Sequence, residues 1–237
     1  MIFAAGLGTR LRPLTDTTPK ALVPVGGAPL LHHLMSKLQQ AGCSHVVVNV
    51  HHHAQQIVDY IATHNYGMRV DVSDESDMLL DTGGGLRKAS SLLAGDEPIL
   101  VHNVDILSNL SFEALLQAHC PDNLATVVVS PRETSRYLLF DDCNCLQGWC
   151  NVKSGEVKPH NIDPAQLHRA AFAGIHVVSP RIFDLMSEMP DKFSIIDFYL
   201  QAMNHHRIMG YTPSAFDMLD VGKVESLTPA EEFIKQL

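Results

Sequence analysis

Residues 4–20 read AAGLGTRLRPLTDTTPK and overlap a short apolar run at residues 2–5 that is typical of a β-strand. Gly6 and Gly8 lie where the chain has to turn sharply. Glycine reaches positive φ without strain and, lacking a Cβ atom, lets backbone N–H groups approach an anion closely. A strand followed by a glycine loop predicts a phosphate-binding turn at the edge of an α/β sheet.

Basic residues strengthen this interpretation. Arg10 and Arg12 follow the glycines, and Lys20 ends the same segment. Three cations on one loop favour a polyphosphate ligand. Neither of the two common phosphate loops is present, since Leu11 stands at the third glycine position of G-x-G-x-x-G and no G-K-[ST] occurs. On spacing alone, a simple turn with solvated basic residues stays open as the alternative.

The remainder of the chain alternates short β-branched runs with segments of helical period, which favours a sheet covered by helices. We therefore expect one α/β domain over residues 1–237, with a doubly wound, mainly parallel but mixed sheet and helices on both faces. The expected strands are residues 2–5, 46–50, 69–72, 98–104, 125–130, 172–178 and 215–219. The expected helices cover residues 30–41, 57–61, 86–93 and a closing segment from about Val224.

Residues 136–158 interrupt this alternation. They are rich in Asp, Asn, Cys and Gly, which predicts a hairpin excursion from the sheet. Three cysteines fall in or near its turn, Cys143, Cys145 and Cys150. Their C-x-C-x4-C spacing departs from the usual C-x2-C pattern of zinc sites, so a structural zinc module is only an alternative.

Composition limits the classes of partner. The chain has 17 Lys and Arg against 26 Asp and Glu, a formal charge of -9, which is the wrong sign for a generalised basic face that binds nucleic acid. No apolar run is long enough to span a membrane, and no signal peptide is evident at the start, so we expect a cytoplasmic protein with no nucleic-acid or membrane partner. The five cysteines suit reduced thiols. The sequence indicates no oligomeric state.

The loop pattern G-x-G-T-R-x-R-P-L-T, followed by T-P-K-A-L-V-P-V-G-G, resembles the signature of the sugar-phosphate nucleotidylyltransferases. The resemblance covers residues 1–110, resumes at residues 172–183 and reappears at residues 220–222. It implies a Rossmann-like nucleotidyltransferase core that transfers a nucleotidyl group from a nucleoside triphosphate to a sugar 1-phosphate. It also implies that Arg10 and Lys20 are the catalytic cations. The residues it implies for nucleotide binding are Ala5, Gly6, Gly8, Thr9 and Arg10.

The segment LDTGGGLRK at residues 80–88 places three glycines near the start of a helix, with Asp81 or Thr82 as the expected N-cap. In the family that the loop resembles, the corresponding T-G-G segment lies against the nucleobase. The resemblance therefore adds Gly83 and Gly84 to the nucleotide-binding set. A glycine-rich surface loop is the alternative.

Two aspartates are candidate magnesium ligands. Asp105 ends an apolar strand at residues 99–105, where ligands of open α/β sheets bind. The run resembles the family's strand ending in Gly-Asp, although Val104 replaces the glycine. FDMLDVG at residues 216–222 resembles the second metal motif, with Asp220 as its carboxylate. Mg²⁺ prefers one or two carboxylates, with phosphate oxygens and water completing its shell.

The resemblance assigns sugar-phosphate binding to Lys20, to Gly174 in FAGIHVV, and by position to Asn151 in an excursion that spans about residues 136–170. Trp149 shares that excursion, but a packed Trp is an equally good interpretation. VVVNVHHH at residues 46–53 supplies Asn49 and His51 as pocket-lining residues only, because consecutive side chains on a strand face opposite sides.

The resemblance implies nucleotidyl transfer to a sugar 1-phosphate but leaves more than one pair of substrates open. The best match is GTP with mannose 1-phosphate, and UTP with N-acetylmuramate 1-phosphate is the alternative. A non-catalytic nucleotide-sugar sensor on the same fold is a third hypothesis. The presence of both cations and both carboxylates favours an enzyme.

Overall fold

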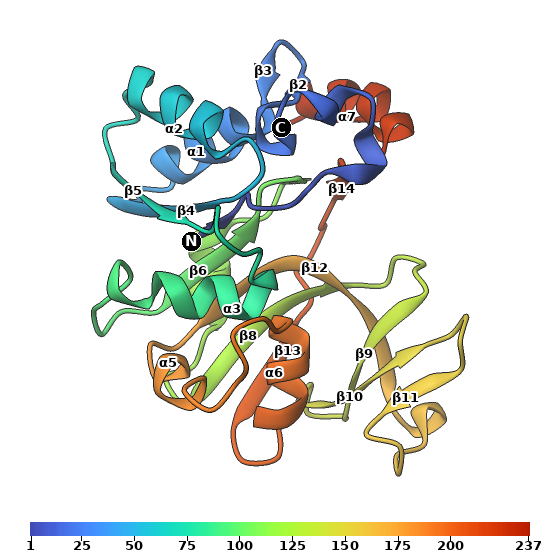
Figure 1. Cartoon of the computed structure of the whole chain (residues 1–237). Helices are drawn as coiled ribbons and strands as arrows, with labels where there is room; N and C mark the ends of the chain where they lie inside the picture. Colours follow the sequence, from blue (N-terminus) through green and yellow to red (C-terminus); the bar gives the residue numbers. More distant parts are fainter.

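A computed structural model describes residues 1–237 and contains one ten-stranded sheet (Figure 1). Its strands are β1 (Ile2–Phe3), β4 (His45–Val50), β5 (Arg69–Asp74), β6 (Ile99–Asn103), β8 (Asn123–Ser130), β9 (Arg136–Phe140), β10 (Leu146–Asn151), β11 (Glu156–Lys158), β12 (His168–Val178) and β13 (Arg207–Tyr211). The strand order is β11-β10-β9-β12-β6-β1-β4-β5, and β8 pairs with β12 and β13 beside this path.

Parallel pairing is confined to two parts of the sheet. β6, β1, β4 and β5 pair in parallel, and so do β8 and β13. The long strand β12 runs antiparallel to β6, β8 and β9 and joins these parts. The expected mixed α/β sheet is confirmed, and its antiparallel share comes from β12 and the strands around it.

Alternation along β4 shows why helices cover both faces. Val46, Val48 and Val50 point into one core, and Val47 points into the other, because successive strand residues face opposite sides. The first core is closed by α1 (Leu30–Gln40), α2 (Ala54–Thr63) and α4 (Phe112–Ala118). The second is closed by α3 (Asp81–Lys88), α5 (Ile182–Leu185) and α6 (Ile195–Ala202). Figure 1 shows α1 and α2 on one side of the sheet and α3 and α6 on the other.

The closing strand lies outside the main sheet. Residues 215–219 were expected as this strand, but β14 covers Met218–Asp220 and pairs antiparallel with β7 (Ile106–Ser108) in a separate two-stranded sheet. A second small pair joins β2 (Pro24–Val25) to β3 (Ala28–Pro29). The expected closing helix is α7 (Leu227–Ile234), which packs on a third core with Leu11, Val25 and Val221.

Residues 136–158 form the expected antiparallel hairpin and one strand more. β9, β10 and β11 make a three-stranded meander. The expectation that this segment leaves the sheet is wrong, because β9 pairs with β12 through His168, Arg169 and Ala170 and so extends the sheet. The missed feature is the length of β12, whose first residues lack the β-branched signal of its second half.

The glycine-rich helix also differs at its start. The N-cap position of α3 is Leu80, and no side chain caps the helix. Asp81 has a φ of 62° and its Oδ1 accepts the N–H of Thr82 at 2.6 Å. Thr82 Oγ1 instead accepts the N–H of Ile195 at 2.9 Å. The expected cap by Asp81 or Thr82 is therefore wrong, because both side chains have other partners. None of the helices combines the length and apolar character that a membrane span requires.

Candidate active site

The first strand ends early because a side chain takes over its hydrogen bonds. Asn49 Oδ1 on β4 accepts the backbone N–H groups of Ala4 at 2.7 Å and Ala5 at 3.3 Å. Asn49 Nδ2 donates to Glu75 Oε1 at 2.6 Å, and Glu75 Oε2 accepts the N–H of Leu80 at 3.1 Å. Burial raises the pKa of Glu75. This buried pair fixes where the chain leaves β1 and enters the glycine loop.

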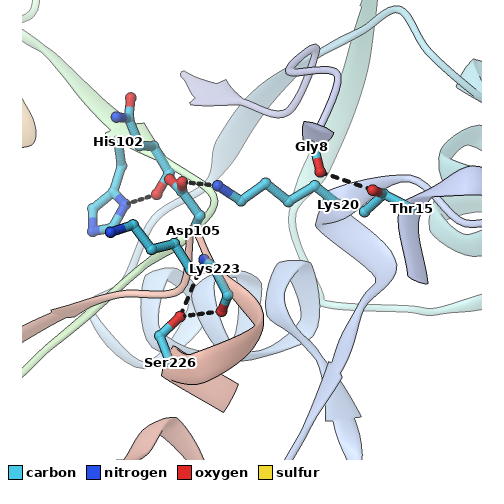
Figure 2. Close-up of polar contacts among 8 residues, drawn as sticks. Gly8, Thr15, Lys20, His102, Asp105, Lys223 and Ser226 are labelled. Atoms are coloured by element: carbon cyan, nitrogen blue, oxygen red, sulfur yellow. Dashed lines mark hydrogen bonds and ion pairs between the residues drawn. The ribbon is translucent and has the colours of Figure 1, made fainter. Parts of the chain in front are cut away.

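Gly8 shapes the loop itself. Its φ is 63°, and its carbonyl accepts a hydrogen bond from the Leu11 N–H at 2.8 Å. The same carbonyl accepts a hydrogen bond from Thr15 Oγ1, also at 2.8 Å (Figure 2). A Cβ atom at this position would lie 2.9 Å from Thr15 Cγ2. Both the conformation and the close packing require glycine.

Lys20 and Asp105 form an ion pair across the base of the loop (Figure 2). Lys20 begins a short 3₁₀ helix, and Asp105 follows β6. Their side chains are 11% and 17% exposed. A cation from the loop segment and a carboxylate from the strand end thus face each other in a largely desolvated position.

Asp220 reaches the same place from the other end of the chain. The β7–β14 pairing sets Asp220 opposite Ile106, and the Val221 N–H donates to the Asp105 carbonyl oxygen at 2.8 Å. Desolvation by the surrounding protein raises the pKa of Asp220, and the charge of Asp105 raises it further, while Lys20, Arg10 and Arg132 lower it. The two expected metal carboxylates are therefore neighbours. Their oxygen donors fit Mg²⁺, which commonly takes two carboxylates and leaves positions for phosphate.

Arg10 extends toward this pair over Gly222. A Cβ atom on Gly222 would lie 2.6 Å from Asp220 Oδ1 and 2.8 Å from Arg10 Nη2. Arg12 points elsewhere and forms an exposed ion pair with Asp16 at 3.3 Å. Of the two loop arginines, only Arg10 joins the acidic pair.

A cavity of about 370 Å³ opens between the loop, the ends of β1 and β6 and the start of α3. Among the expected site residues, its lining contains Ala5, Gly6, Lys20 and Asp105, together with Asn49. Four other expected site residues, Gly8, Thr9, Arg10 and Asp220, are not part of this lining. Sequence reasoning missed Glu75 and Lys192, which also line the cavity; no local motif marks either of them.

Gly83 and Gly84 lie beneath the cavity wall and not in it. Their N–H groups donate to the Phe193 carbonyl oxygen at 2.9 and 3.2 Å. A Cβ atom on Gly83 would lie 2.3 Å from the Phe193 ring, and one on Gly84 would lie 2.3 Å from the Asp191 carbonyl oxygen. The cavity wall at this point is made by Asp81 and Thr82, the two residues before Gly83. Close packing on residues 191–193 explains these glycines.

A second cavity of about 460 Å³ adjoins the first and shares Phe3, Asp81, Thr82 and Asn103 with it. The meander supplies its far wall with Arg136, Trp149 and Lys158, and α6 and β12 complete it. Gly174 has a φ of 75° and packs against Asn103, with 2.6 Å between Asn103 Nδ2 and a Cβ atom placed there. Asn151 is not part of this lining, although it follows Trp149 by two residues and pairs with Arg136. The sequence analysis did not single out Arg136 and Lys158 as cavity residues. The only sequence feature that could have marked them is that they are the basic residues at the two ends of the segment 136–158.

The histidine and cysteine patterns form no metal centre. No group of three or more His, Cys, Asp or Glu side chains is arranged to hold a metal ion. All five cysteines are free thiols; Cys143 is exposed and Cys150 is buried. The zinc module is therefore not formed by these residues. His51 lines neither cavity.

Comparison with known proteins identifies the family. Residues 1–236 match the family described as nucleotidyl transferase. The chain belongs to the nucleotidyl transferase family. This confirms the expected family and the expected reaction class, in which an enzyme transfers a nucleotidyl group to a sugar 1-phosphate.

Curated relatives of this nucleotidyl transferase include two kinds of enzyme. It is 43% identical over 235 residues to N-acetylmuramate alpha-1-phosphate uridylyltransferase of Neisseria meningitidis serogroup B, covering 98% of this chain and 96% of the relative. It is 32% identical over 197 residues to the mannose-1-phosphate guanylyltransferase catalytic subunit beta of Drosophila melanogaster, covering 80% of this chain and 50% of the relative.

A solved structure confirms the fold. A putative glucose-1-phosphate thymidylyltransferase from Bacillus anthracis superposes with a TM-score of 0.83, at 18% identity, covering 100% of this chain and 94% of the other.

Proposed function

We propose that this nucleotidyl transferase transfers a uridylyl group from UTP to N-acetylmuramate 1-phosphate and releases pyrophosphate. The observation that supports this choice is the 43% identity to the Neisseria uridylyltransferase along nearly the whole of both chains. The mannose enzyme of Drosophila matches at lower identity and over half of its length. The sequence motifs alone favour GTP and mannose 1-phosphate, whereas the similarity to the Neisseria enzyme favours the alternative, UTP and N-acetylmuramate 1-phosphate.

The glycine loop is the proposed site for the nucleotide phosphates. Ala5 and Gly6 line the first cavity, and Gly8, Thr9 and Arg10 continue the turn behind it. Backbone N–H groups and one arginine suffice for this task in a chain whose net charge is negative, because the contacts are local. Arg10 would also stabilise the leaving pyrophosphate.

Lys20, Asp105 and Asp220 form the proposed reaction centre. Asp105 and Asp220 would hold Mg²⁺, which when bound would neutralise charge on the phosphates. Lys20 now pairs with Asp105. With Asp105 holding Mg²⁺, the ammonium group of Lys20 would be available to bridge the two reacting phosphoryl groups. It lines the first cavity, so it reaches the substrate space without a change of fold.

The reaction needs no general base. The second pKa of a phosphate monoester is about 6, so the attacking oxygen of the sugar 1-phosphate is already anionic at neutral pH. This oxygen attacks the α-phosphorus in line, and the bond to the pyrophosphate oxygen breaks. Catalysis then consists of positioning and charge stabilisation, which is what the loop, the lysine and the acidic pair supply.

The second cavity is the proposed sugar site. Gly174 lets β12 pack closely on Asn103, which lines both cavities, and Asn151 belongs to the meander that forms the far wall. Residues 136–170 would therefore act as the sugar-binding part of a single domain over residues 1–237. Gly83 and Gly84 would serve the nucleobase indirectly, by holding Asp81 and Thr82 against the first cavity. We also propose a cytoplasmic location, where nucleoside triphosphates are available.

The test is pyrophosphate release with Mg²⁺ in a matrix of UTP, GTP and dTTP against N-acetylmuramate, mannose and glucose 1-phosphates. UTP with N-acetylmuramate 1-phosphate should give the highest kcat/KM. Highest activity with GTP and mannose 1-phosphate would overturn the substrate assignment. Binding of UTP without turnover in any pair would instead favour the nucleotide-sugar sensor.

A further inference from the structure

The second cavity has a cationic wall that a neutral hexose does not require. Arg136 and Lys158 are the two basic residues of its lining, and both come from the meander. In the pairing of β9 with β10, Arg136 lies opposite Asn151 and Leu138 opposite Trp149. In the pairing of β10 with β11, Trp149 lies opposite Lys158. Directly paired residues project to the same face, so both cations and the indole project from one face.

Arg136 is an unused cation. Its guanidinium has no ion-pair or hydrogen-bond partner in the protein; beyond the strand pairing, only its backbone N–H is engaged, by Thr134 Oγ1 at 3.4 Å. A guanidinium presents parallel N–H donors that match the two oxygens of a carboxylate. An unpartnered arginine that lines a cavity next to a phosphate site is therefore free to bind an anionic group of a ligand.

Lys158 is held in place but weakly paired. Its Nζ lies 5.5 Å from the centroid of the Trp149 ring, within cation–π range. It lies 3.5 Å from Glu156 Oε1 and 3.7 Å from Asp197 Oδ1, beyond hydrogen-bond length, with all three side chains well exposed. Such pairs contribute little. A ligand carboxylate can compete for this lysine at small cost, while Trp149 keeps the ammonium at the cavity.

We infer that Arg136 and Lys158 bind a carboxylate carried by the sugar, so that the enzyme selects an acidic sugar 1-phosphate over its neutral counterpart. The inference rests on the proposed function, because N-acetylmuramate is N-acetylglucosamine with a lactyl ether that ends in a carboxylate. The phosphate group of such a substrate lies toward Lys20 in the first cavity, and the carboxylate lies toward the meander. Selection then depends on charge at the far end of the sugar from the reacting phosphate.

The matched substrates are N-acetylmuramate 1-phosphate and N-acetylglucosamine 1-phosphate, each with UTP, and the readout is the ratio of their kcat/KM values. In Arg136→Gln and in Lys158→Gln, this ratio should fall by about tenfold or more, the usual effect of losing a hydrogen bond to a charged group. The loss should appear mainly in KM for the acidic substrate. Arg136→Lys should keep part of the preference, since it keeps the charge.

Arg169→Gln is the control variant. Arg169 is exposed on β12 and lies opposite Leu139, on the reverse face of the sheet from Leu138 and Trp149. The Arg169→Gln substitution therefore removes one positive charge from the same sheet but outside the cavity. The ratio of the two kcat/KM values in Arg169→Gln should equal that of the wild type. Equal losses for both substrates in the Arg136 and Lys158 variants, or no loss in either, would overturn carboxylate recognition while leaving the uridylyl transfer established.

The wild type separates the two claims. If it does not transfer a uridylyl group to N-acetylmuramate 1-phosphate, the proposed function fails. Glucuronic acid 1-phosphate against glucose 1-phosphate then decides the inference on its own. A preference for the acidic sugar that Arg136→Gln abolishes would support it, and a preference for the neutral sugar would refute it.

Discussion

Val221 N–H donates to the carbonyl oxygen of Asp105 at 2.8 Å, and this one backbone bond joins two segments that are more than a hundred residues apart in the chain. It places Asp220 beside Asp105 through the pairing of β14 with β7. The acidic pair therefore depends on a two-stranded sheet outside the main one. Its geometry is set by backbone pairing, which is stiffer than two independent side-chain contacts.

Removal of the Lys20 ammonium should affect turnover more than binding. Lys20→Met should lower kcat by at least about a hundredfold, the range seen when one donor to developing charge is lost. Nucleotide affinity should change far less, because the glycine loop is intact. Single-turnover kinetics and UTP titration measure the two effects. Lys235→Met, an exposed lysine of the last turn, is the control; comparable kcat values for the two variants would exclude Lys20 from the reaction.

Asp220 should determine how much Mg²⁺ the enzyme requires. A chelator should abolish pyrophosphate release, and added Mg²⁺ should restore it. Asp220→Asn should raise the Mg²⁺ concentration for half-maximal activity by at least about tenfold, the effect that even an outer partner of a metal ligand has. Asp217→Asn, an exposed aspartate on the same segment, should leave the Mg²⁺ titration as it is in the wild type. Superimposable titrations for all three proteins would contradict the metal role.

Gly222→Ala should damage the site without unfolding the chain. The added methyl would meet the mobile ends of Arg10 and Asp220, at 2.8 and 2.6 Å, so these side chains must shift. We expect kcat/KM to fall about ten- to a hundredfold, as for a displacement of about 1 Å. The free energy of unfolding should change by less than about 1 kcal/mol, since no backbone is displaced. Full activity in this variant would show that Arg10 and Asp220 need not lie so close.

Lys37 should make stability depend on pH above neutrality. Its Nζ donates to the Ser108 carbonyl oxygen at 2.5 Å, and burial lowers the pKa of Lys37 to about 8 from 10.5. Between these values the unfolded chain binds more protons than the folded one, so stability rises with pH. Relative to Lys37→Met, the wild-type free energy of unfolding should rise by up to about 3 kcal/mol from pH 8 to 10.5.

Urea unfolding of both proteins at pH 7, 8, 9 and 10 measures this difference. Lys153→Met, in the exposed turn after β10, provides the comparison for loss of a lysine at the surface. A difference between wild type and Lys37→Met that stays flat across the series would show that Lys37 titrates as if solvated.

Short-range sequence patterns predicted most of the strands and helices in the parallel part of the sheet. β-branched runs located β4, β6 and β8, and apolar spacing located α1 and α2, because burial of a strand or helix face leaves a short-range pattern. The glycine loop is also a local signal, carried by Gly6, Gly8 and the basic residues that follow them. Asp105 at a strand end is a local feature, and its partnership with Asp220 came only from the resemblance to a family.

What sequence reasoning missed is long-range. Gly83 and Gly84 stay predicted contacts for a base, but the reason they are glycines lies elsewhere: Gly83 packs on Phe193 and Gly84 on the Asp191 carbonyl oxygen, both more than a hundred positions away. Glu75 carries no motif, and only the fold brings it under Asn49. β13, with Gly210 as its next-to-last residue, has little strand signal, and its pairing with β8 forms it. Each of these depends on a partner that no window of the sequence contains.

β12 joins the wall of the second cavity to the central sheet. Its first residues pair with the meander, and its second half pairs with β6 and β8 in the central sheet. The meander, which would recognise the acceptor, is thus attached to the first half of β12. The glycine loop follows β1, a different strand of the sheet. Substitutions in the meander can redirect an ancestral enzyme to a new acceptor while the nucleotide chemistry is inherited unchanged, so evolutionary divergence in this fold has a route that leaves the reaction intact.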